Sequence, residues 1–167
     1  MARTTAEALD RLQDLLAHPD TGVNMRMAAI ESRDGVIMER IPAAQIMEMN
    51  LPADIADENL DFDYPLILLF AEQAENENVE RFAWFSGSIA ISVEIRLTAD
   101  KPDTLEPSIH RYAEAVLDVL QDSAGEWSAG LMYNGRYSVR YLPSTLGGDN
   151  FLQSARISLT LEQYVNA

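Results

Sequence analysis

Residue types that often carry chemistry are scarce in this chain. It has no cysteine, and its two histidines, His18 and His110, stand far apart in the sequence. The lack of cysteine excludes a disulfide framework, a thiolate metal site and a cysteine nucleophile. One histidine stands at a predicted helix end and the other on a predicted helix surface, where histidine is usually an ordinary surface residue. Phosphate-binding glycine loops, the GxSxG elbow and the HExxH motif are also absent from the sequence. We therefore expect no catalytic residues, no metal ligands and no cofactor.

Carboxylates are the abundant chemical group, and five of them fall in one short segment: Asp54, Asp57, Glu58, Asp61 and Asp63. Carboxylate oxygens bind Ca²⁺, but this segment lacks the central glycine and the closing glutamate of an EF-hand loop. A catalytic pair of carboxylates needs two different environments, which a sequence does not show. We interpret the segment as a solvated loop or an anionic contact surface. The alternative is a small metal- or ligand-binding domain, or an enzyme, that uses this segment together with His110.

Charge is unevenly distributed along the 167 residues. The chain has 27 Asp and Glu against 12 Lys and Arg, a net charge of -15, which disfavours binding in a nucleic-acid groove. Ten of the acids lie between Arg40 and Arg81, where there is no Lys or Arg. The segment 136–161 has the opposite balance, with Arg136, Arg140 and Arg156 against a single acid. Two patches of opposite charge favour head-to-tail contact between copies of one chain, and solvated surfaces are the alternative.

The helices predicted to position these groups follow from apolar spacing. A capping-box pair followed by regularly spaced leucines predicts a helix over residues 5–17. The run that ends at the Asp34-Gly35 turn predicts a second helix over 21–32. Residues 36–63 lack a sustained period and predict a packed loop with a short helical turn near 43–48. No stretch is apolar enough for a membrane span, and the first residues do not form a signal peptide, so we expect a protein without membrane contact.

Strand patterns dominate the rest of the chain. Apolar runs and period-two alternation predict four strands, at 64–70, 88–98, 136–143 and 151–165. The second of these is predicted to be half-buried, and the polar residues before it to form a connection. An amphipathic helix is predicted between the second and third strands, over 106–122.

Two turn motifs complete the C-terminal half. Asn134-Gly135 predicts a hairpin turn, and Leu146–Asp149 predicts the turn that joins the last two strands. The order of elements predicts one α+β domain over residues 1–167, with a mostly antiparallel four-stranded sheet, helices packed on one face and an N-terminal helix.

Four segments of the C-terminal half carry a family resemblance. They are YPLILLF, SGSIAISVEIRLT, PSIHRYAEAVLDVL and the closing hairpin YSVRYLPSTLGGDNFLQSARISLTLE, with a Gly-Gly-Asp turn and a Phe-Leu-Gln strand start inside Gly147–Gln153. In order and type they resemble the tail-terminator or tail-completion proteins of long-tailed bacteriophages and prophages. The resemblance covers residues 60–165, and the N-terminal helix fits it in order and length.

This resemblance implies a non-enzymatic virion protein. In that family the protein forms a hexameric ring on the head-proximal end of the tail tube, stops tube polymerisation and presents the surface that joins the head. The implied partners are further copies of the chain, the tail tube protein and the head-tail connector proteins, with DNA passing non-specifically through the lumen. The implied location is the virion tail, assembled in the host cytoplasm. The alternative within virion assembly is a head-tail adaptor or neck protein.

The resemblance also suggests roles for particular residues. We expect Arg136, Arg140, Arg156 and Phe151 at subunit or tube contacts. The acidic segment is expected to face the lumen or the connector, where its repulsion from phosphate prevents DNA from sticking.

Overall fold

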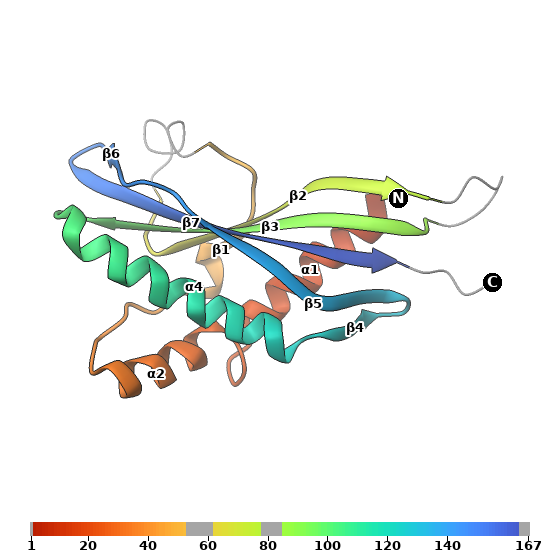
Figure 1. Ribbon diagram of the computed structural model, residues 1–167, viewed down its shortest axis with the longest axis horizontal. Helices are drawn as coiled ribbons and strands as arrows, with labels where there is room; N and C mark the ends of the chain where they lie inside the picture. Colours follow the sequence, from red (N-terminus) through yellow and green to blue (C-terminus); the bar gives the residue numbers. More distant parts are fainter. Residues whose placement is uncertain (1, 53–61, 78–84, 164–167) are drawn as a thin grey trace.

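Three α-helices lie against one face of a curled seven-stranded sheet in the computed structural model, which describes residues 2–52, 62–77 and 85–163 (Figure 1). The helices are α1 (Ala2–Ala17), α2 (Val23–Asp34) and α4 (Leu105–Asp122), with short 3-10 turns at η1 (Ala43–Gln45) and η2 (Pro102–Thr104). The strands are β1 (Ile46–Glu48), β2 (Leu66–Asn76), β3 (Gly87–Ala99), β4 (Gly125–Ser128), β5 (Leu131–Tyr141), β6 (Thr145–Gly147) and β7 (Asn150–Gln163).

The core lies between the sheet and the helices. The apolar face of α4 is buried against the alternating residues of β3, such as Ile91 and Val93, and the matching residues of β7, while α1 packs on β1 and β2. The smaller α2 packs on α4 and ends at Gly35, whose left-handed backbone (φ 67°) lets its N–H close the last turn. The three predicted helices are confirmed.

The strands run in the order β1-β2-β3-β7-β5-β4, and β6 also pairs with β7. Every strand pair among the described residues is antiparallel except β1 with β2, which is parallel. The four predicted strands correspond to the long ones, β2, β3, β5 and β7. The predicted number of strands was wrong, because the three short strands β1, β4 and β6 carry too few residues for a periodic pattern.

Three local predictions also need correction. The polar residues after Phe70 were predicted to form a connection, but Ala71–Asn76 continue β2 along an edge of the sheet, where both faces tolerate polar side chains. Asn134-Gly135 is not a turn but a bulge inside β5, with Gly135 at φ 81°, and the reversal comes earlier, before Leu131. Part of the helical turn predicted near 43–48 is β1.

The sheet face opposite the helices is less exposed than its polar residues suggest. Ser92, Glu94 and Arg96 alternate with the core residues of β3, yet all three are at most 2% exposed. Neighbouring apolar residues of β2 and a charged cluster described below cover this face, so the prediction of a half-buried β3 was wrong.

Candidate functional site

One edge of the sheet is open over half its length and acidic. β1 pairs only with Ile67–Leu69 of β2, and the backbone N–H of the next residue, Met49, also bonds to Leu69. Among the described residues, no strand covers the outer side of Ala71–Glu75. This open half carries Glu72 and Glu75 and is followed by another acid, and all three side chains are exposed. A strand edge without a neighbouring strand can pair with a strand of another molecule.

The opposite edge is also half open, but it is basic. β4 pairs with β5 only over Leu131–Tyr133, and no strand of the described chain covers the outer side of Tyr137–Tyr141. Arg136 and Arg140 are exposed there, and no acid lies in β5. Both terminal tyrosines of this stretch are 38% exposed, so the edge also offers apolar surface.

Unpartnered arginines distinguish the basic edge. Six arginines form ion pairs within the chain: Arg26, Arg33, Arg40, Arg96, Arg111 and Arg156. Within the part of the chain that the structure describes, Arg136 and Arg140 have no carboxylate partner, and the same holds for Arg11. In a chain with more than twice as many acids as bases, this pattern leaves the guanidinium groups of β5 available to another molecule.

Arg156 belongs instead to a buried charged cluster on the sheet face opposite the helices. Both oxygens of Glu94 are used: Oε1 accepts from Arg96 Nε at 2.7 Å, and Oε2 accepts from Arg156 Nη2 at 2.6 Å. Arg96 also donates to the carbonyl of Leu51, while its Nη1 is buried without a partner. Arg156 lies over the ring of Phe70, 5.4 Å from its centre. The main bonds of Arg156 are internal, and its role at a subunit or tube contact stays a prediction.

The cluster continues toward the acidic edge through hydroxyl groups. Ser92 Oγ donates to Glu72 at 2.6 Å and lies 3.4 Å from the hydroxyl of Ser158. Arg156 Nη1 lies 4.0 Å from the same carboxylate of Glu72. These contacts pair the carboxylates with guanidinium and hydroxyl groups and fix the register of neighbouring strands. They leave no space beside a reactive group in which a substrate could bind. We interpret the cluster as structural.

Of the other predicted site residues, the structure describes Phe151, Asp63 and His110. Phe151 is half-buried and packs against the core. Asp54, Asp57, Glu58 and Asp61 lie outside the described residues, and Asp63 is exposed just before β2. His110, on the exposed side of α4, lies 3.2 Å from Glu106 and stacks on Tyr141 with ring centres 4.2 Å apart.

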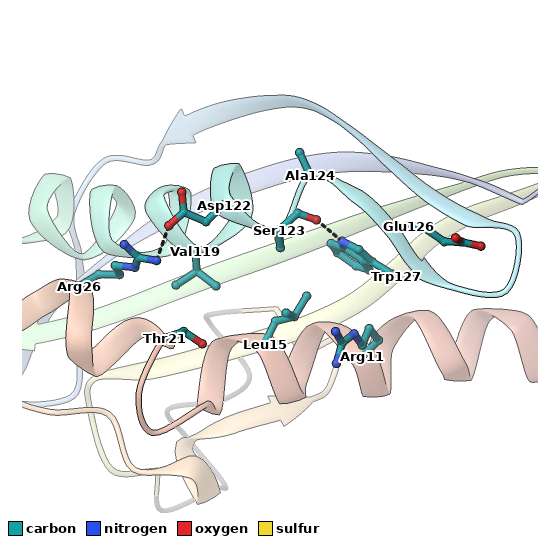
Figure 2. Close-up of a pocket in the computed structure, with 10 residues that line it drawn as sticks. All are labelled: Arg11, Leu15, Thr21, Arg26, Val119, Asp122, Ser123, Ala124, Glu126 and Trp127. Carbon is teal, nitrogen blue, oxygen red and sulfur yellow. Dashed lines mark hydrogen bonds and ion pairs between the residues drawn. The ribbon is translucent and has the colours of Figure 1, made fainter.

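A hollow of about 410 Å³ opens where α1, α2, α4 and β4 meet (Figure 2). Leu15, Val119 and Trp127 supply its apolar lining, and the Trp127 ring donates to the carbonyl at the end of α4. Arg11 and Arg26 also line it, the latter ion-paired with the carboxylate at the end of α4. Since two carboxylates offset the two guanidinium groups, the hollow favours no ligand charge. Thr21 also lines it, and its hydroxyl lies 3.0 Å from Nδ1 of His18, both on the exposed turn between α1 and α2.

Within residues 2–52, 62–77 and 85–163, no three His, Asp or Glu side chains are grouped so that they could hold a metal ion. None of the helices in the same ranges is long and apolar enough to cross a membrane.

The sequence missed the buried cluster and the two half-covered edges. The buried cluster did have a signal in the sequence, because Glu94 and Arg96 stand two residues apart on the polar side of an otherwise apolar strand. The edges depend on strand order, which no local pattern reveals. No known protein-family model matches this chain, and no curated protein matches it closely enough to be counted as a relative.

Proposed function

We propose that this protein is a structural virion protein, a tail terminator that forms a ring on the end of the tail tube, stops tube growth and joins the tail to the head. The observation that carries the proposal is the pair of half-open sheet edges with opposite charge. One edge carries three acids and no base over residues 71–77, and the other carries Arg136 and Arg140 without an acid. The terminator role itself comes from the resemblance in element order.

Opposite edges favour a head-to-tail arrangement over a two-fold dimer. In a two-fold contact each edge would meet its own copy, acid against acid or arginine against arginine, which is unfavourable between paired strands. In a head-to-tail contact the acidic edge of one copy meets the basic edge of the next. Repetition of such a contact around an axis closes a ring.

Assembly in solution tests the ring. Native mass spectrometry and negative-stain electron microscopy of the purified protein, alone and with tail tubes, should show closed rings of one fixed copy number. Reversing the basic edge with Arg136→Glu and Arg140→Glu should abolish them. The control is Lys101→Glu, which reverses one charge, half of the change in the double variant, at an exposed residue away from both edges. Rings that persist in the double variant, or a wild-type chain that stays monomeric even with tube ends, would overturn the proposal.

Tail length tests the terminator role. The gene is expected to lie beside those for a tail tube and a tape-measure protein, and its deletion should give overlong tails. Head-filled particles without any tail would indicate a head-tail adaptor instead. Loss of metal or small-molecule binding in an Asp57, Asp61 and His110 triple variant that still assembles tails would favour the ligand-binding alternative.

A further inference from the structure

The two short edge strands lie at different heights of the sheet. Reading across the paired strands, the β1 residue Met47 is level with Leu68, Glu94, Arg156 and Arg140. β1 is therefore level with the open half of β5, at the far side of the same sheet.

The same reading places β4 at the other end of the sheet. Its partner Met132 in β5 is level with Glu162, Ser88 and Glu75. β4 is therefore level with the open half of β2. Each edge has a short strand where the other edge has a vacant strand position.

We propose that neighbouring copies join edge to edge, without a shift along the strands, in an arrangement that we call the interlock. One strand position separates β2 of the first copy from β5 of the second. β1 of the first copy fills one end of this position, and β4 of the second copy fills the other end. This inference rests on the proposed ring and specifies its contact. β1 of one copy then lies beside Val139–Tyr141 of its neighbour, and β4 of the neighbour lies level with Ala74 and Glu75 of the first copy, so each short strand covers part of an open strand edge.

Strand direction agrees with this interlock. β2 and β7 run one way and β3 and β5 the other, since each adjacent pair is antiparallel. β1 is parallel to β2 and β4 is antiparallel to β5, so both short strands run in the same direction. The new contact between β1 and β5 is then antiparallel, and the new contact between β4 and β2 is parallel, like the existing pairing of β1 with β2.

Charge at the contact is divided between the two faces of the sheet. Glu48 of β1 is level with Val139 and lies on the helix side beside Asp10 of α1, whereas Arg140 is level with Met47 and lies on the opposite face. Burial raises the pKa of Glu48, and the adjacent carboxylate raises it further. The contact is therefore carried by strand position and backbone pairing and not by an ion pair.

Disulfide trapping tests the interlock, because the chain has no cysteine of its own. Met49 follows β1 directly. In the interlock it lies level with Ser138 in β5 of the neighbouring copy, and both side chains are on the same face of the sheet. The variant Met49→Cys with Ser138→Cys should link neighbouring copies into a ladder on non-reducing gels. Within one copy the two positions lie four strand spacings apart, roughly 19 Å across a flat sheet, which is too far for a disulfide.

A second variant tests the competing register. If β2 itself slid along the open half of β5, Glu75 instead of Met49 would lie beside Ser138, so Glu75→Cys with Ser138→Cys is the matched control. The expected result is a ladder with Met49→Cys and none with Glu75→Cys. A ring that forms without the disulfide between positions 49 and 138, or with a disulfide between positions 75 and 138, overturns the interlock but not the proposed function. A chain that never assembles, even with tube ends, overturns the proposed function as well.

Discussion

Loss of the Glu94 carboxylate is expected to be severely destabilising, because it leaves the buried guanidinium of Arg96 without its ion-pair partner. The Glu94 side chain is 3% exposed and the Arg96 side chain 1%. Removing one partner of a buried ion pair costs about 3–5 kcal/mol. Typical domains are stable by about 5–15 kcal/mol, so Glu94→Leu should remove a large part of the total. At about 2–4 °C per kcal/mol for a domain of this size, Tm should fall by roughly 6–20 °C.

A double variant separates this explanation from simple loss of packing. Replacing both partners, Glu94→Leu with Arg96→Met, leaves no buried charge and should recover most of the lost stability, since apolar replacements of buried pairs are often neutral. Arg156→Gln is the control. Its side chain is 40% exposed, so its loss should cost about 1 kcal/mol. Urea unfolding followed by circular dichroism measures all four proteins.

Two results would refute the reasoning. If Glu94→Leu cost no more than Arg156→Gln, the cluster would behave as a solvated surface pair. If the double variant were less stable than Glu94→Leu alone, the bond from Arg96 to the carbonyl of Leu51 would matter more than the ion pair.

Three further predictions concern the hairpin, acid stability and assembly. Gly87→Ala should cost about 1–3 kcal/mol in urea unfolding, because the new Cβ would lie 1.9 Å from a backbone oxygen of β2. Hydrogen bonds from Arg33 and Arg111 lower the pKa of Asp34 from 3.8 to about 2. The stability lost in Asp34→Asn should therefore be measurable at pH 5 and vanish as the pH falls through about 2. Glu48 has a raised pKa in the free copy, and the interlock would cover it further by placing it beside Val139 of the neighbour, which raises the pKa again. Light scattering should therefore show rings strengthening as the pH falls through the raised pKa, and less so in Glu48→Gln.

The long elements were predictable because each carries its own periodic pattern. The alternation from Ile89 to Leu97 and the helical spacing from Ile109 to Leu120 both repeat often enough to identify a strand and a helix. The turn at Leu146–Asp149 was equally local, since a glycine with positive φ stands where the reversal needs it.

The candidate site was not predictable in the same way, because it arises from strand order and register. Ile46–Glu48 are too few to show a period, and they form a strand only because β2 lies beside them. Gly135 has the composition of a turn, but pairing with β7 on both sides of it makes it a bulge. The charges of Arg136 and Arg140 were visible in the sequence, whereas their position on an open edge was not.

A chain with two open strand edges of opposite charge must form a closed ring if its assembly is to stop at a fixed size. A head-to-tail contact that does not close adds copies without limit and produces a filament. A terminator must do the reverse and stop growth, so the rotation per copy has to return the last acidic edge to the first basic one. In an open chain of n copies, one acidic and one basic half-edge would stay exposed, and exposed edges promote aggregation. Closing the ring brings these two half-edges together. A fixed number of copies per assembly therefore distinguishes a closed cap from an open filament. Filaments of varying length on tube ends would count against a terminator, even if every strand contact were as described.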